Sequence, residues 1–183
     1  MSRLIMWNLI SLDGYYDGEK AWELGWHDTA WGEELERLSL EQLHAADRLL
    51  FGRVTYEGMA GYWSSAKGEI ADLMNRVPKV VVSRTLERAD WNNTTLVKDD
   101  VPAEIAKLKG EGNQSTFVFG SGDLSETLTR HGLFDEVRLC VAPVILGQGR
   151  TLFGRGLDFA KLKLLEARPL ATGAVVLRYE PLR

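Results

Sequence analysis

Cysteine and histidine are scarce in this sequence of 183 residues, which contains one cysteine and three histidines. A single cysteine excludes an intramolecular disulfide, and the position of Cys140 inside an apolar run fits a thiol in a reducing compartment. His27, His44 and His131 lie far apart, and none is paired with another histidine or with the cysteine at a metal-ligand spacing. We therefore expect neither a disulfide framework nor a bound metal.

Long apolar runs and excess positive charge are also missing. No apolar segment approaches the roughly 20 residues of a membrane-spanning helix, and the N-terminus lacks the basic and apolar regions of a secretion signal. The formal net charge of −4 argues against a general nucleic-acid-binding surface, although it leaves room for a local cationic pocket. We expect a cytoplasmic protein that binds neither membrane nor nucleic acid, folded as one domain over residues 1–183.

Apolar runs alternate with helical patterns over the first two thirds of the chain. Strands are predicted over residues 3–10, 48–51, 78–83, 93–97 and 116–119, and helices over 29–46, 65–76, 100–109 and 123–131. This alternation indicates a mainly parallel sheet with helices on both faces. The pattern then changes to a long strand over 135–146 and an antiparallel hairpin over 161–168 and 174–180. The expected fold is therefore α/β, with one mixed, mainly parallel central sheet and a C-terminal antiparallel hairpin.

A glycine turn follows the strand predicted over residues 116–119. Gly120 and Gly122 separate this strand from a helix that begins near Asp123. Free backbone N–H groups and the positive end of the helix dipole attract an anion, so this turn is a candidate phosphate site. Taken alone, the pattern fits equally well a tight turn that needs glycine only for its backbone geometry.

Two other predicted strands end in loops that carry an arginine. These loops are Gly52-Arg53-Val54-Thr55 and Ser83-Arg84-Thr85. Ligands of an open α/β sheet gather beyond the carboxyl ends of its strands, so both arginines should lie near the glycine turn. Either arginine alone is better explained as a solvated loop charge, but the two together, at loops expected on the same sheet edge as the glycine turn, favour a dinucleotide. Because an arginine fork matches a phosphate monoester, the expected cofactor is NADP(H) and not NAD(H).

The order of these motifs along the chain resembles that of the dihydrofolate reductase-like fold. Within this fold, the motifs resemble the RibD C-terminal domain family, which is the reductase domain of riboflavin biosynthesis. The matching segments are SLDG at 11–14, LFGRVTYE at 50–57, VVSR at 81–84, FVFGSG at 117–122 and DEVRLCVAPVILGQG at 135–149, followed by Leu152-Phe153. They cover almost the whole chain. The resemblance implies an NADPH-dependent reductase with a dihydrofolate reductase-like three-layer fold, and it implies a homodimer that uses the terminal strands.

The resemblance also implies which residues bind the cofactor. The adenosine 2′-phosphate is assigned to Gly52, Arg53, Val54, Thr55, Ser83 and Arg84, and the pyrophosphate to Gly120, Ser121, Gly122, Asp123 and Leu124. The nicotinamide is expected near Leu9, Ile10 and Tyr16, with Ile145 and Gly147 close by.

The substrate side is less closely defined. Trp22, Trp26 and Trp31 are expected to stack on a planar heterocycle, although packing of the loop on the sheet explains each tryptophan equally well. The substrate is expected to be small and pterin- or pyrimidine-like, as for dihydrofolate reductase or 5-amino-6-(5-phosphoribosylamino)uracil reductase, and it receives a hydride.

Several residues are candidates for the catalytic acid. Dihydrofolate reductase carries one acid at the start of its first helix, where this chain offers Asp28, Glu33 and Glu34. Asp13 is a further candidate, although Asp-Gly after a strand is also ordinary turn chemistry. We take Asp13 and Glu34 as the candidate catalytic residues. The alternative is a non-catalytic NADPH-binding module, since no carboxylate is singled out by its flanking pattern.

Overall fold

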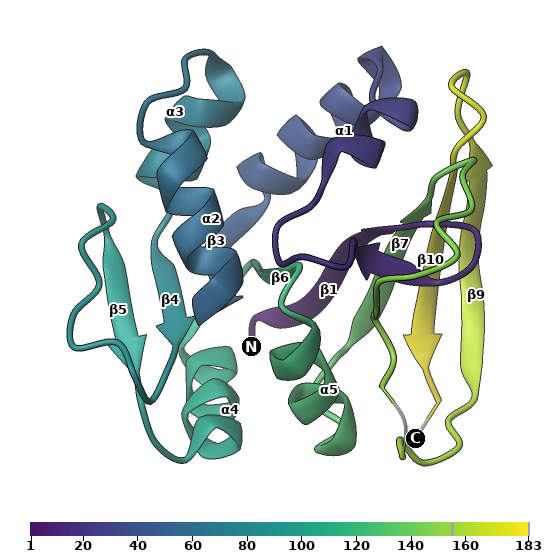
Figure 1. The fold of residues 1–183 in the computed structure, drawn as a ribbon. Helices are drawn as coiled ribbons and strands as arrows, with labels where there is room; N and C mark the ends of the chain where they lie inside the picture. The colour runs from purple at the N-terminus through teal and green to yellow at the C-terminus, as the bar shows by residue number, and fades with distance from the viewer. Residues whose placement is uncertain (155, 183) are drawn as a thin grey trace.

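The computed structural model describes residues 1–154 and 156–182 and shows one eight-stranded central sheet (Figure 1). The strands are β1 (Arg3–Ile10), β3 (Ala46–Gly52), β4 (Lys79–Val82), β5 (Thr94–Val97), β6 (Ser115–Phe119), β7 (Glu136–Val141), β9 (Leu162–Pro169) and β10 (Val175–Pro181). Their order is β5-β4-β3-β6-β1-β7-β10-β9. The first six pair in parallel, and β10 pairs antiparallel with both β7 and β9. The predicted mixed sheet and terminal hairpin are confirmed.

Helices cover both faces of the sheet (Figure 1). They are α1 (Glu33–His44), α2 (Arg53–Trp63), α3 (Glu69–Arg76), α4 (Val101–Glu111) and α5 (Gly122–Arg130), with a short 3-10 helix η1 (Gly25–Thr29) before α1. Buried side chains of α1, α2 and α3 pack on one face, and those of α4 and α5 pack on the other. The three layers expected from the alternation of strands and helices are therefore present.

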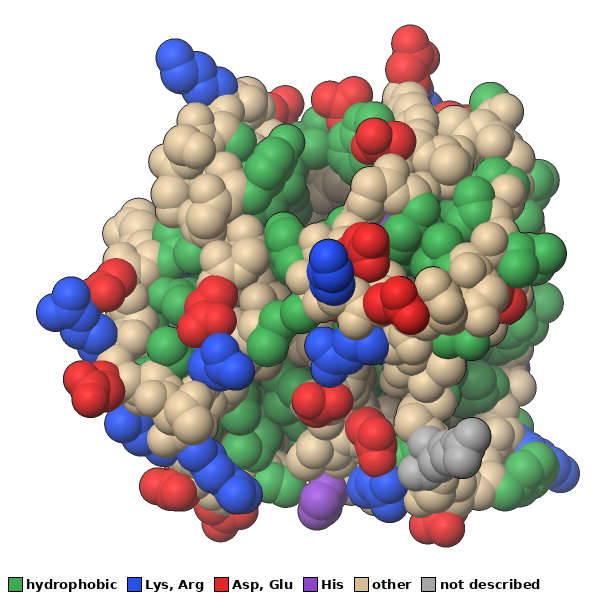
Figure 2. Space-filling model, viewed as in Figure 1, with side chains coloured by type: hydrophobic (Ala, Val, Ile, Leu, Met, Phe, Trp, Pro, Cys, Tyr) green, Lys and Arg blue, Asp and Glu red, His purple; other side chains and the backbone are tan. Residues whose placement is uncertain are grey.

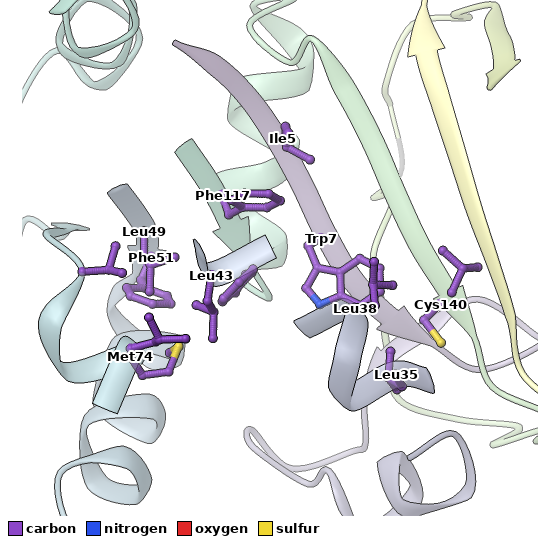
Figure 3. Packing of buried hydrophobic residues seen from close by; sticks show 14 of the residues in the cluster. Ile5, Trp7, Leu35, Leu38, Leu43, Leu49, Phe51, Met74, Phe117 and Cys140 are labelled. Atoms are coloured by element: carbon purple, nitrogen blue, oxygen red, sulfur yellow. The ribbon is translucent and has the colours of Figure 1, made fainter. Parts of the chain in front are cut away.

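The first strand is buried on both faces because it lies between β6 and β7 at the centre of the sheet. Its side chains alternate, so that Ile5 and Trp7 join the core beneath α1 while Leu4 and Met6 join the core beneath α4 and α5. Leu38 of α1 lies close to Trp7 in Figure 3. A nearly continuous apolar run is what such a doubly covered parallel strand requires.

Several features differ from the predicted pattern. The range of α2 was not predicted, and α1 and α3 begin at residues 33 and 69, where 29 and 65 were expected. β7 ends at Val141, whereas the strand was predicted to reach residue 146; Pro143, which has no N–H for a sheet ladder, follows within two residues. A second, two-stranded sheet pairs β2 (Tyr15–Asp17) with β8 (Arg150–Thr151) and was not predicted. This small sheet brings residue 150 next to the loop that follows β1.

No helix within the described residues is long and apolar enough to cross a membrane. The same residues contain no cluster of three His, Cys, Asp or Glu side chains arranged to hold a metal ion. Cys140 is fully buried in β7, and burial raises the pKa of its thiol to about 11, so the thiol stays protonated and unreactive.

Candidate functional site

A polar cavity of about 690 Å³ lies beyond the carboxyl ends of β3, β4, β5 and β6. Its wall includes Gly52, Arg53, Val54, Thr55, Ser83, Arg84, Lys98, Ser121, Gly122, Asp123, Leu124 and Arg150. The three loops that the sequence placed at one sheet edge therefore do meet. Gly120 does not line this cavity but lines the neighbouring one described below.

The glycine turn and the loop after β3 are bonded to each other. Gly120 and Ser121 both have left-handed backbones, with φ angles of +57° and +61°. The Ser121 hydroxyl accepts a hydrogen bond from the Gly52 N–H at 2.9 Å, and the Ser121 N–H donates to Oγ1 of Thr55 at 3.0 Å. Because each loop satisfies polar groups of the other, the two loops form one connected rim at the start of α5.

The cations of the polar cavity differ in their partners. Arg53 forms an ion pair with Glu57, one helical turn further along α2, at 2.9 Å. Arg150 lies 3.6 Å from the carboxylate of Asp123. Arg84 and Lys98 are exposed and have no ion-pair partner among the described residues, so their charges are available to an anion.

Sequence reasoning missed two of these cations. Lys98 comes directly after β5, so the rule that pointed to the carboxyl ends of β3 and β4 would have found it. Arg150 gave no such signal, because it reaches the cavity only through the pairing of β8 with β2. Its guanidinium lies 5.6 Å from the ring centre of Tyr16.

An aromatic cavity of about 500 Å³ lies beside the polar one, at the carboxyl end of β1. Its wall includes Trp7, Asn8, Leu9, Trp22, His27, Asp28, Trp31, Gln42, Met59, Tyr62, Trp63, Phe119 and Gly120. Figure 2 shows the molecule hollowed between α1 and α2, with hydrophobic side chains around the hollow. Two of the three predicted substrate tryptophans, Trp22 and Trp31, line this cavity. Trp26 does not; it packs against the core, and its ring lies nearly perpendicular to that of His27, with the ring centres 4.3 Å apart.

Three residues, Tyr16, Asp17 and Thr55, line both cavities, and we call them the junction. Tyr16 was predicted to lie near the nicotinamide; burial raises the pKa of its phenol, which therefore stays protonated at neutral pH. Leu9 lines the aromatic cavity next to the junction, whereas Ile10 lines neither cavity and packs on the opposite face of the sheet.

Asp17 holds the loop after β2 in place and gave no signal in the sequence. It is only 4% exposed, and its carboxylate accepts hydrogen bonds from the backbone N–H groups of Gly18, Trp22 and Glu23 at 2.9 to 3.1 Å. These bonds hold Trp22 in a left-handed backbone conformation with a φ angle of +67°. Residues other than glycine rarely adopt this conformation. The carboxylate is thus committed to the loop.

The two candidate catalytic carboxylates lie outside both cavities. Asp13 accepts hydrogen bonds from the Ser11 hydroxyl at 2.6 Å and from the N–H groups of Leu146 and Gly147 at 3.1 and 2.7 Å. The bond from Ser11, with help from the two N–H groups, lowers the pKa of Asp13 to about 2, so this group carries no proton at neutral pH. Glu34 accepts a hydrogen bond from the Ala171 N–H at 2.6 Å.

Among the other acids considered, the structure brings Asp28 to the aromatic cavity, whereas Glu33 is exposed and lines neither cavity. Ile145 and Gly147, expected close to the nicotinamide, also lie outside both cavities, and Ile145 is 73% exposed. Their loop leaves the sheet after β7 and is held by Asp13 instead.

Comparison with known proteins identifies the family and the fold. The family model described as the RibD C-terminal domain matches residues 3–176. Uncharacterized protein YyaP of Bacillus subtilis (strain 168) is 28% identical over 97% of this chain and 94% of its own length. A Shewanella sp. PV-4 structure, provisionally named as a riboflavin biosynthesis protein, superposes with a TM-score of 0.82 at 20% identity, covering 99% of both chains.

The fold is shared more widely. Dihydrofolate reductase from Enterococcus faecalis superposes with a TM-score of 0.65 at 14% identity, covering 99% of this chain and 97% of its own. At such low identity the likeness establishes a dihydrofolate reductase-like fold, as expected from the sequence motifs.

Proposed function

The chain belongs to the RibD C-terminal domain family, and on this premise we propose that it is an NADPH-dependent reductase that transfers a hydride to a small heterocyclic substrate. One observation carries the proposal: the arginine loops and the glycine turn meet in a polar cavity that shares the junction with an aromatic cavity. A dinucleotide in the first cavity and a flat substrate in the second would place donor and acceptor side by side.

The polar cavity has the chemistry to hold NADPH. Arg53, Arg84 and Lys98 supply positive charge at the loops after β3, β4 and β5, and we assign the 2′-phosphate to them. The first turn of α5, from Gly122 to Leu124, supplies backbone N–H groups and a favourable helix dipole for the pyrophosphate. The nicotinamide is assigned to the junction next to Leu9.

NADPH supplies the hydride when it is bound, so the protein has to orient the two ligands and exclude water. The connected rim formed by Ser121, Gly52 and Thr55 provides the first function, because its hydrogen bonds fix the position of the turn relative to the junction. Trp22, whose backbone N–H is bonded to Asp17, contributes its side chain to the wall of the aromatic cavity, and we assign the exclusion of water to this aromatic wall.

Charge reversal at Arg84 tests the cofactor assignment. Arg84→Glu should weaken NADPH binding at least about tenfold and change NADH binding little, because only NADPH carries the additional phosphate. Arg88→Glu is the matched control, since Arg88 is exposed and lies outside both cavities. An equal loss of affinity for both cofactors in Arg84→Glu would remove the assignment. Binding is measured by titration of NADPH and NADH fluorescence.

A second reading, a non-catalytic NADPH-binding module, is favoured by the positions of Asp13 and Glu34 outside both cavities. Steady-state NADPH oxidation over a panel of pterins and pyrimidines separates the two. Turnover of any member establishes the reductase, whereas NADPH binding without turnover of any member supports the module.

We also propose that the protein is a homodimer. β9 is an edge strand of the central sheet, and Leu162, Leu164 and Leu165 in it are 42 to 52% exposed, close to Leu182 at 53%. Exposed leucines grouped on an edge strand are a liability unless another surface covers them. We propose that a second copy of the chain covers these leucines by pairing through its own terminal hairpin, as the family resemblance implies.

A further inference from the structure

We infer that the aromatic cavity accepts a flat, neutral or cationic heterocycle that carries no phosphate group. This inference rests on the proposed function, because it assigns the substrate to the aromatic cavity and the cofactor to the polar one. Two reductase activities were expected from the sequence motifs. The inference argues against one of them, 5-amino-6-(5-phosphoribosylamino)uracil reductase, because the substrate of that enzyme is phosphorylated.

The charges of the two cavities are segregated. Arg53, Arg84, Lys98 and Arg150 all line the polar cavity, and no lysine or arginine among the described residues lines the aromatic one. A phosphate monoester carries almost two negative charges at neutral pH and needs cationic donors when it leaves water. In the proposed assignment, bound NADPH engages Arg53, Arg84 and Lys98, and Arg150 lies 3.6 Å from the carboxylate of Asp123. A substrate phosphate in the aromatic cavity is therefore left without a cationic partner there.

The charged side chains of the aromatic cavity are carboxylates. Asp17 is bonded to the loop, but Asp28 is exposed at the wall and has no hydrogen-bond or ion-pair partner among the described residues. His27, beside it, adds no positive charge, because burial lowers the pKa of its ring to about 4. This wall therefore repels an anion and attracts a cation.

The remaining walls favour a flat ring. Trp31 and Tyr62 line the cavity although they are 47% and 60% exposed, and Trp22 and Trp63 complete an aromatic surface on which a heterocycle can stack. Aromatic faces attract cations and not anions.

Two buried amides that line this cavity, Asn8 and Gln42, have side-chain nitrogens without a hydrogen-bond acceptor among the described residues. Gln42 is 2% exposed and lines the cavity, and its Oε1 accepts a hydrogen bond from Nη1 of Arg138 at 3.2 Å. Arginine has only donors, so this bond fixes the amide orientation and leaves Nε2 of Gln42 as the group without a partner within the described residues. A ring nitrogen or carbonyl oxygen on the ligand is the complement of such a donor.

Matched pairs of ligands that differ only in a phosphate test the inference. The probes are cytidine and cytidine 5′-monophosphate, uridine and uridine 5′-monophosphate, and riboflavin and flavin mononucleotide, each titrated against tryptophan fluorescence. The protein is saturated with NADP⁺, so that the phosphorylated probes cannot occupy the polar cavity. In every pair that binds, we expect the unphosphorylated member to bind at least about tenfold more tightly.

Charge reversal at the wall supplies the second arm of the test. Asp28→Lys should remove this preference, bringing the phosphorylated member to equal or tighter binding. Glu41→Lys makes the same change of charge on an exposed residue of α1 outside both cavities and should leave the preference intact. Circular dichroism establishes that both variants are folded before they are compared.

Three results would overturn the inference: equal or tighter binding of the phosphorylated members by the natural protein, no binding of any probe, or an unchanged preference in folded Asp28→Lys. Each can occur while NADP⁺ still saturates the protein, so the cofactor assignment would stand. Failure of NADP⁺ to bind would instead contradict the proposed function itself.

Discussion

The phenol of Tyr16 lies against the backbone of Gly122, where an added Cβ would come within 2.6 Å of the phenol oxygen. Gly122 is the first residue of α5, and Tyr16 belongs to the junction. The sequence motif explained this glycine by the approach of a phosphate. The structure adds a second reason, which is that only a residue without a side chain lets Tyr16 of β2 pack against the start of α5.

A similar contact joins Trp22 to Gly58 of α2 and yields a stability prediction. A Cβ on Gly58 would collide with the indole ring of Trp22, whereas a Cβ on Gly61, one turn later in the same helix, would meet no atom within 4 Å. Gly58→Ala should lower the free energy of unfolding by about 1–3 kcal/mol through overpacking. Gly61→Ala should raise it by up to about 1 kcal/mol through helix propensity. Urea denaturation measures both, and an equal effect of the two would contradict the packing of Trp22 on α2.

The ion pair of Arg53 with Glu57 competes with any phosphate that binds Arg53. Glu57→Gln should therefore tighten NADPH binding by up to about fivefold, the upper end for a surface ion pair, and should leave NADH binding unchanged. Glu126→Gln is the control, because it removes the equivalent pair with Arg130 outside both cavities. A gain for NADH as large as that for NADPH would show that Arg53 does not meet the 2′-phosphate.

The depressed pKa of Asp13 predicts a dependence of stability on acid. Its pKa is about 2 in the folded protein and 3.8 without the hydrogen bonds, so its stabilisation is complete above pH 3.8 and is lost as the pH falls through 2. Between these values, the unfolding temperature of the natural protein should fall faster than that of Asp13→Asn, which has no carboxylate to protonate. Parallel curves would contradict this. A loss of NADPH oxidation at pH 7 larger than the loss of folded protein would support the catalytic assignment of Asp13 instead.

The proposed homodimer makes a prediction about the edge strand. Leu164→Lys should convert the dimer to a monomer, because it places a charge within the exposed leucines of β9. Leu12→Lys changes a residue that is 67% exposed in the loop after β1 and should leave the association unchanged. Sedimentation velocity measures both, and a natural protein that sediments as a monomer would end the proposal.

The sheet and the edge at which its loops meet were predictable because they depend on short-range patterns. Apolar runs such as residues 80–82 identify strands locally, and parallel pairing then brings Arg53 and Arg84 to one edge without further information. The early end of β7 was also predictable, since Pro143 stands in the sequence.

The substrate side depends on tertiary structure that the sequence does not display. Trp22 and Trp26 are four residues apart, yet only Trp22 lines the aromatic cavity. Asp17 bonds the backbone of Trp22, whereas Trp26 lies in η1 and packs against the core. The pairing of β2 with β8 involves too few residues to leave a periodic pattern, and so Arg150 was not anticipated. Glu34 is an acidic residue at the position in the sequence where a catalytic acid was expected, but its carboxylate accepts a hydrogen bond from the Ala171 N–H.

The wall common to both cavities makes their occupants thermodynamically dependent on each other. Any change in position that a nucleotide imposes on Tyr16, Asp17 or Thr55 alters the surface offered to the second ligand. Thermodynamic linkage requires this influence to be reciprocal. If the bound nucleotide raises the affinity for the substrate about tenfold, then the bound substrate raises the affinity for the nucleotide by the same factor. The three side chains of the junction would therefore set how strongly each ligand changes the affinity of the other.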